Sequence, residues 1–170
     1  VCKNMKNRII PLLSWILVAW ICKVFLTSLY YKFTGHPDTV YIFTTIGNWL
    51  QTYLGESLGS LFSRYGAYLI GSFELLTSLI LLSPLVFWLL EKLSPGANLP
   101  RRATLQCIGG LMATVVMSGA VFFHLFSPLG VEVLHEGKGD GGSLFYAAVS
   151  ILVSGIILFI LNRQYRTNPE

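Results

Sequence analysis

Four runs of mostly apolar residues constrain this chain more than any other feature of its sequence. The runs cover residues 9–31, 65–90, 103–126 and 143–161. A helix needs about 20 apolar residues to cross the hydrocarbon core of a bilayer, and a helix is favoured there because it satisfies its own backbone hydrogen bonds. The sequence therefore predicts an all-α, polytopic membrane protein with four transmembrane helices in a bundle.

The composition agrees with this class of protein. Charged residues make up 12% of the chain, against about 25% in an average soluble domain, and the mean hydropathy of +0.64 excludes a disordered chain. Four spans use about 80 residues, which leaves enough for loops and one short helix. We therefore expect a single integral membrane domain over residues 1–170, without a separate soluble catalytic domain.

The first run has features of both a signal peptide and a membrane span. It follows Lys3, Lys6 and Arg8, which resemble the basic region of a signal peptide. No small-x-small cleavage site follows, because the run ends in Leu-Tyr-Tyr-Lys. We therefore expect it to be retained as a span, and we leave open whether the true start is Val1 or Met5.

A short amphipathic helix is predicted between the first two spans, over about residues 38–54. Gly35 marks a turn before it, and Pro37 suits its first turn because the missing N–H costs nothing there. The segment is too short and too often polar to span, so we expect it to lie in the membrane interface or to fold against the bundle. Its apolar positions, spaced by three and four residues, are Ile42, Phe43, Ile46, Trp49, Leu50 and Tyr53.

Basic residues predict the orientation of the spans, because cytoplasmic flanks are enriched in Lys and Arg. We expect both chain termini and the loop at 91–102 to be cytoplasmic, and the loops at 32–64 and 127–142 to face outward. Eight basic residues then lie on the cytoplasmic side: Lys3, Lys6, Arg8, Lys92, Arg101, Arg102, Arg163 and Arg166. The three on the outer side are Lys32, Arg64 and Lys138.

Lys23 and Glu74 are charges at membrane depth, where an unpaired charge costs several kcal/mol. At 1.5 Å per residue, Glu74 lies roughly 14 Å and Lys23 roughly 12 Å below the outer ends of their spans. We therefore expect Glu74 to face the bundle interior and to pair with Lys23 directly, or with Lys32 folding down from the outer boundary. Such a pair orders the bundle, handles a proton or binds a ligand, and these alternatives stay open.

Two further features bear on helix packing. Pro84 predicts a kink in the second span, with a freed carbonyl that a neighbour must satisfy. Small residues spaced by four favour close packing of the third span on the fourth, and a face for a homo-oligomer is the alternative interpretation. These residues are Gly109 and Ala113, with Ser118 and Gly119 farther along, and Ser150 and Ser154.

Two histidines near the predicted outer side are candidate binding groups. His124 is expected near the outer interface, where it can line an outward-opening polar pocket with Glu74. His135 and Glu136 match no defined metal motif, so no metal site is predicted. The glycine-rich stretch before Ser143 lacks the order of a phosphate-binding loop and is expected to be a flexible turn.

Together, four segments resemble the DoxX-like family of small four-helix bacterial membrane proteins. They are KFTGHP at 32–37, GSFELL at 71–76, MSGAVFFH at 117–124 and DGGSLF at 140–145. The resemblance implies a bacterial inner-membrane location and matches the family's basic, acidic and histidine positions to Lys32, Glu74 and His124. It also implies a possible quinone cofactor and partner subunits of a membrane redox complex, since some family members belong to such complexes. Lys23 is additional to the family pattern.

Several functional hypotheses follow. The preferred one is a non-catalytic subunit or scaffold of a quinone-linked redox complex, with a polar outward-facing pocket for a quinone head group or a small anion. The alternative is a proton-coupled carrier or permease for a small solute, in which Glu74 takes up and releases a proton; no inverted repeat, which would favour a carrier, is evident in the sequence. A third hypothesis, that the chain catalyses the oxidation of sulfur compounds with quinone as acceptor, rests on the family resemblance alone. The sequence contains no haem, iron–sulfur or flavin motif, so we do not expect an enzyme on its own, and we expect lipid, not nucleic acid, as a partner.

Overall fold

The computed structural model describes residues 2–93 and 99–167, with side chains for residues 9–93 and 99–163. The expected start at Val1 and the side chains of Lys3, Lys6, Arg8 and Arg166 lie outside this part. The elements in chain order are α1 Cys2–Phe33, α2 Pro37–Leu54, α3 Glu56–Leu93, α4 Arg102–Phe126, β1 Leu134–His135, β2 Lys138–Gly139 and α5 Ser143–Thr167. Within the described residues, four helices are long and apolar enough to cross a membrane: α1, α3, α4 and α5. The chain is therefore predominantly helical and compatible with a multi-pass membrane protein.

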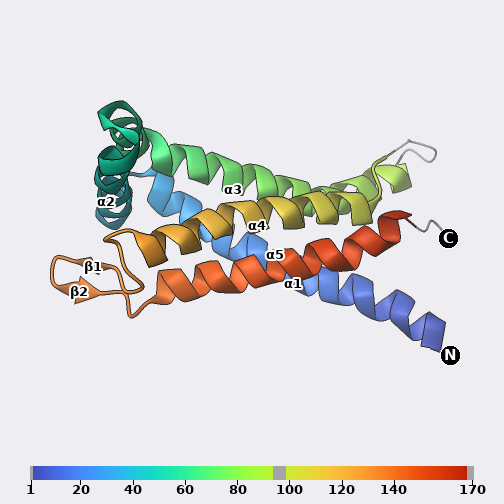
Figure 1. Cartoon of the computed structure of the whole chain (residues 1–170). Helices are drawn as coiled ribbons and strands as arrows, with labels where there is room; N and C mark the ends of the chain where they lie inside the picture. The colour runs from blue at the N-terminus through green and yellow to red at the C-terminus, as the bar shows by residue number, and fades with distance from the viewer. Residues whose placement is uncertain (1, 94–98, 168–170) are drawn as a thin grey trace.

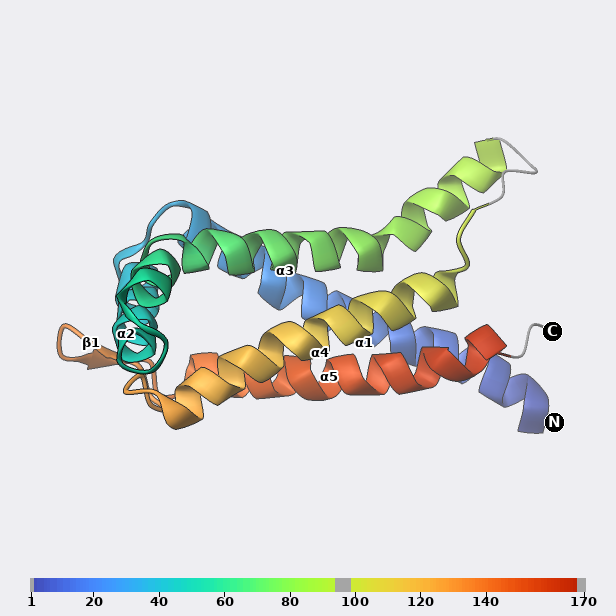
Figure 2. The same cartoon turned by 45° about the horizontal axis from the view of Figure 1, so that its top comes forward.

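The four long helices lie side by side, and α2 lies across one end of them (Figures 1 and 2). Helix α1 packs on α3 and α5, α3 also packs on α4, and the most extensive contact joins α4 to α5. Val18, Ile21 and Phe25 of α1 are almost fully buried at the centre, together with Leu81 of α3 and Ile151 of α5. The two termini lie at the end of the molecule opposite α2.

Helix α3 begins at Glu56, nine residues before the predicted second span at 65–90. The stretch from Glu56 to Arg64 is too polar to be recognised as part of a membrane span, but it is helical in the structure. Gly55 separates it from α2 as a single residue with φ of +90°, a conformation that glycine adopts without strain. Hydropathy thus located the apolar part of α3 and missed its polar first turns, which pack against α2.

Helix α2 covers almost the same residues as the predicted helix at 38–54. Pro37 occupies its first turn, as expected, and the side chain of His36 accepts a hydrogen bond from the Asp38 amide at 3.4 Å. Phe43 and Ile46 are buried, whereas Tyr53 is 70% exposed. The helix therefore folds against the start of α3.

The contact between α4 and α5 is closest at Gly110 and Gly155. A Cβ atom on Gly110 would lie 2.9 Å from the carbonyl oxygen of Gly155, which is closer than a side chain allows. The prediction that these two helices pack closely is confirmed, but the residues differ in part. Gly109 faces Leu81 of α3, and the hydroxyl of Ser150 accepts a hydrogen bond from Trp20 of α1 at 3.1 Å.

Pro84 lies inside α3, and the last part of this helix leans away from α4 in Figure 2. Proline has no N–H to donate to the carbonyl four residues earlier, which belongs to Ile80. The Ser83 hydroxyl donates to that carbonyl at 2.8 Å. The expectation that a neighbour satisfies the freed carbonyl is therefore confirmed, and the neighbour is the adjacent residue on the same helix.

The loop between α4 and α5 is an ordered hairpin organised by Asp140. Its carboxylate accepts hydrogen bonds from the amides of Val133 at 2.8 Å, Gly142 at 3.0 Å and Leu144 at 2.9 Å, and from the Ser143 hydroxyl at 3.2 Å. Burial by itself raises the pKa of Asp140, but these hydrogen bonds together lower it below its usual value of 3.8. The glycine-rich stretch is thus a turn held by the Asp140 carboxylate, and α5 begins at Ser143 as expected.

Candidate functional site

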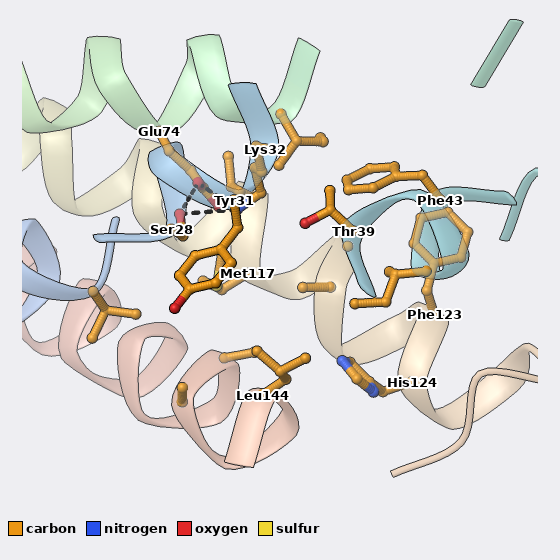
Figure 3. Close-up of a pocket in the computed structure, with 18 of the residues that line it drawn as sticks. Ser28, Tyr31, Lys32, Thr39, Phe43, Glu74, Met117, Phe123, His124 and Leu144 are labelled. Carbon is orange, nitrogen blue, oxygen red and sulfur yellow. Dashed lines mark hydrogen bonds and ion pairs between the residues drawn. The ribbon is translucent and has the colours of Figure 1, made fainter. Parts of the chain in front are cut away.

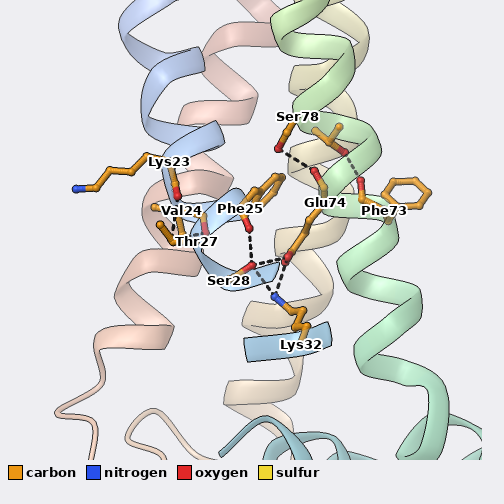
Figure 4. A network of polar contacts seen from close by, with 10 residues as sticks. Lys23, Val24, Phe25, Thr27, Ser28, Lys32, Phe73, Glu74 and Ser78 are labelled. Atoms are coloured by element: carbon orange, nitrogen blue, oxygen red, sulfur yellow. Dashed lines mark hydrogen bonds and ion pairs between the residues drawn. The ribbon is translucent and has the colours of Figure 1, made fainter. Parts of the chain in front are cut away.

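The ion pair of Lys32 and Glu74 is the core of the candidate site. Lys32 Nζ lies 2.7 Å from Glu74 Oε2, and the Glu74 side chain is only 3% exposed. Ser28, one turn before Lys32 on α1, contacts both partners: Lys32 Nζ donates to its hydroxyl oxygen at 3.0 Å, and that hydroxyl lies 2.7 Å from Glu74 Oε2 (Figure 4). The Ser28 hydroxyl also lies 2.7 Å from the carbonyl oxygen of Phe25, so its one proton is shared between that oxygen and the carboxylate. Lys32 supplies the countercharge of the buried carboxylate.

Lys23 is not part of this site: of the two alternatives predicted for Glu74, the structure has the pair with Lys32 and not the pair with Lys23. Its side chain is exposed, and its Nζ lies 5.5 Å from the centre of the Trp20 ring; in Figure 4 it points away from Glu74. Lys23 and Lys32 are nine residues apart, which is two and a half turns, so they lie on opposite faces of α1. A matching depth in the membrane is therefore not enough to predict an ion pair. The position of each lysine around the helix axis decides which of them faces Glu74 on α3.

The ion pair lines a cavity of about 510 Å³ near the α2 end of the molecule. Five helices contribute to its walls, and most of the lining side chains are apolar or aromatic (Figure 3). Polar groups stand at separate points of the wall: Lys32 and Glu74 at one place, and Thr39 and His124 elsewhere. A mostly apolar cavity with a few convergent polar groups is typical of a small-molecule binding site.

His124 also lines this cavity, as one of the sequence-based alternatives had it. The residue is 8% exposed, and its Nδ1 lies 2.7 Å from the carbonyl oxygen of Gly130. A carbonyl oxygen only accepts, so Nδ1 carries the proton and donates. In the neutral ring Nε2 is then an acceptor, and in the protonated ring it is a second donor.

Beside the cavity, a polar contact joins α2 to the hairpin. His135 Nδ1 lies 2.8 Å from Asp38 Oδ1, and the His135 ring stacks on Tyr41 with 4.7 Å between ring centres. Ile46 of α2 also forms a small buried cluster with Leu129 and Val133 of the following loop. Within the described residues no group of three or more His, Cys, Asp or Glu side chains is placed to hold a metal ion.

The geometry restricts what the cavity can bind. A lysine ammonium has three N–H donors, and the two contacts of Lys32 to Glu74 and Ser28 leave one for a ligand. The Lys32–Glu74 pair has no net charge, so it favours a neutral hydrogen-bond acceptor over a charged anion.

Sequence reasoning missed Ser28, Thr39 and Asp38 as site residues. Ser28 had a usable signal, because it lies four residues before Lys32 and three after Phe25, on the face of α1 that is buried. No sequence signal pointed to Thr39 or Asp38, because they reach the cavity only when α2 packs across the ends of the long helices. No protein-family model matches the chain, and no curated protein or solved structure shows significant similarity to it.

Proposed function

We propose that this chain is a quinone-binding, non-catalytic subunit or scaffold of a redox complex in a bacterial inner membrane. The observation that carries the proposal is the neutral Lys32–Glu74 pair in the wall of an otherwise mostly apolar cavity. A quinone head group is a flat, apolar ring with carbonyl oxygens on opposite edges. Lys32 has a donor for one oxygen, and His124 offers a second polar group on another wall.

The proposal includes a membrane arrangement. The four long helices would form a transmembrane bundle with both termini in the cytoplasm, and the cavity would open on the outer side. The described basic residues at the end opposite α2, which include Lys92, Arg101, Arg102 and Arg163, support this orientation. In this arrangement α2 would lie at the outer interface, above the ends of the spans. We also propose that the chain belongs to the DoxX-like family, because the four sequence segments described above resemble that family.

Quinone binding by the purified protein tests this function. The protein in neutral detergent is equilibrated with a short-chain ubiquinone or menaquinone, and the bound quinone is quantified after removal of free ligand. Losing one hydrogen bond of about 1 kcal/mol or slightly more weakens binding about tenfold. We therefore expect Lys32→Gln combined with Glu74→Gln, which leaves no buried charge unpaired, to weaken binding about tenfold.

Lys23→Gln is the matched control, because it removes a lysine from the same helix but from the opposite face. It should bind quinone as the unaltered chain does. Equal binding by the double variant and the control would overturn the assignment of the cavity. The subunit role is tested separately by gentle extraction from the native membrane: a co-purifying redox protein supports it, and a lone chain contradicts it.

A proton-coupled carrier is the second candidate, favoured by one observation. Glu74 is a buried carboxylate that lines a cavity, which is the arrangement of a proton-binding group in transporters. Reconstitution into liposomes with an internal pH dye distinguishes the two. Solute-dependent proton uptake that Glu74→Gln abolishes would support the carrier, and no uptake in protein that binds quinone would exclude it.

A further inference from the structure

A second cavity, of about 600 Å³, lies at the end of the molecule opposite α2. Its walls come from three parts of the chain: Trp15 on α1, the stretch of α3 from Pro84 to Glu91, and the segment from Leu99 to Arg102. The last part of α3 leans away from α4 (Figure 2), and Pro84 lies inside this helix. None of these residues belongs to the cavity around Glu74.

The charge of this second cavity favours an anion. Arg101 and Arg102 line it, and Glu91 is the acidic residue among its lining side chains. Arg101 is exposed, whereas Arg102 is partly buried and donates to Gln106 Oε1 at 2.6 Å, which fixes its position. Two guanidinium groups in one wall are suited to a phosphate, because each presents a planar set of N–H donors.

The rest of the wall is apolar and aromatic. Trp15, Leu85, Phe87 and Trp88 line the cavity beside the arginines. Trp88 is 58% exposed, and Lys92 Nζ lies 3.9 Å from its ring centre, an arrangement common where a helix leaves the hydrocarbon region. A free phosphate would use the arginines alone, but a lipid would use both the arginines and the aromatic wall.

We propose that this cavity binds an anionic phospholipid, with its phosphate on Arg101 and Arg102 and an acyl chain against Trp15 and Phe87. Basic pockets between transmembrane helices are known to take the head groups of acidic lipids. The site is separate from the proposed quinone cavity, and it holds whether or not the quinone proposal does. A bound lipid would lie beside the last part of α3, which leans away from α4 in Figure 2.

Native mass spectrometry of the purified protein tests the site. The protein is delipidated in neutral detergent and titrated with phosphatidylglycerol, with phosphatidylcholine of the same chains as the reference lipid. We expect tight retention of about one phosphatidylglycerol per chain and no comparable retention of phosphatidylcholine. Each basic residue near the surface adds about fivefold to the affinity for an acidic lipid, so Arg101→Gln should weaken retention about fivefold.

Two controls make the result decisive. Arg64→Gln removes an exposed arginine at the other end of the molecule and should leave retention unchanged. Trp15→Ala tests the apolar wall that would contact the acyl chain. It should weaken the retention of phosphatidylglycerol and leave the binding of inorganic phosphate unchanged. Equal retention of both lipids, equal loss with Arg64→Gln, or displacement of phosphatidylglycerol by millimolar phosphate would each overturn the proposal.

Discussion

At the scale of single residues, helical phase decides which charges meet. Lys32 is four residues after Ser28, so both side chains lie on the face of α1 that meets Glu74. Lys23 has the same charge and a similar expected depth, but it lies on the other face. The positions of Val18, Ile21 and Phe25 mark the buried face, and continuing their spacing leads to Ser28 and Lys32.

Lys32→Met is expected to destabilise the protein by leaving Glu74 buried without its countercharge. Breaking a buried pair costs about 3–5 kcal/mol, and we expect about 3 kcal/mol because the Lys32 side chain is 15% exposed. Denaturant titration followed by circular dichroism in detergent measures the loss. Adding Glu74→Gln should restore much of the stability, since Ser28 can donate to the amide oxygen.

Lys23→Met is the control for this measurement. It removes a lysine at membrane depth that does not pair with Glu74, so the free energy of unfolding should not fall. A loss in Lys23→Met as large as that in Lys32→Met would contradict the assignment of the pair.

Asp140→Ala is expected to weaken the start of α5. The carboxylate accepts from three backbone amides, and loss of a helix-capping side chain costs about 1–2 kcal/mol. The lowered pKa of Asp140 means that its ionised form stabilises the fold fully above the usual pKa of 3.8 and that this contribution disappears as pH falls through the lowered value. Thermal unfolding across this acidic range measures both effects. Asp140→Asn, which keeps one acceptor but no charge, should lack that part of the pH dependence.

At the scale of elements, the close approach of α4 and α5 depends on glycines that face each other. Gly110 and Gly155 admit no side chain between the two backbones. The sequence indicated the right pair of helices from its small residues, but the pattern did not distinguish Gly109 from Gly110. Adjacent helix positions differ by about 100° in direction, so only the packed orientation of α4 shows which glycine meets α5 and which meets Leu81.

Gly110→Ala is expected to push α4 and α5 apart. The added methyl group would lie 2.9 Å from a backbone oxygen that cannot move alone, and such overpacking costs about 1–3 kcal/mol. Gly119→Ala on the same helix is the matched control, because nothing lies within 4 Å of its new methyl group and alanine favours a helix by about 1 kcal/mol. Unfolding in detergent should therefore show opposite signs for the two variants. Equal signs would contradict the packing described at Gly110.

At the scale of the whole molecule, the two cavities lie at opposite ends of the long helices. The Glu74 cavity is covered by α2 and the hairpin, and the second cavity lies near the end of α3. In the proposed orientation, the first opens to the outside and the second faces the cytoplasmic surface. The orientation therefore determines which compartment supplies a ligand to each.

Cysteine labelling measures this orientation. In a chain whose Cys2, Cys22 and Cys107 are replaced by alanine, we introduce Lys138→Cys in β2 or Lys92→Cys at the end of α3. A membrane-impermeant maleimide on intact spheroplasts should label the first and should label the second only after permeabilisation. The reverse pattern would invert the proposed topology, and labelling of both in intact cells would exclude it.

The sequence by itself determined the number of long apolar helices and the apolar part of each, because hydropathy is a property of each residue summed along a local window. It also indicated Glu74, Lys32 and His124, since charges and histidine are rare in such windows. Only the tertiary structure decided that Lys32, and not Lys23, pairs with Glu74. That choice depends on how α1 and α3 are rotated about their axes relative to each other. The two helices are separated in the chain by α2, so no local sequence pattern predicts this rotation. The hairpin and the two cavities depend on the same long-range packing.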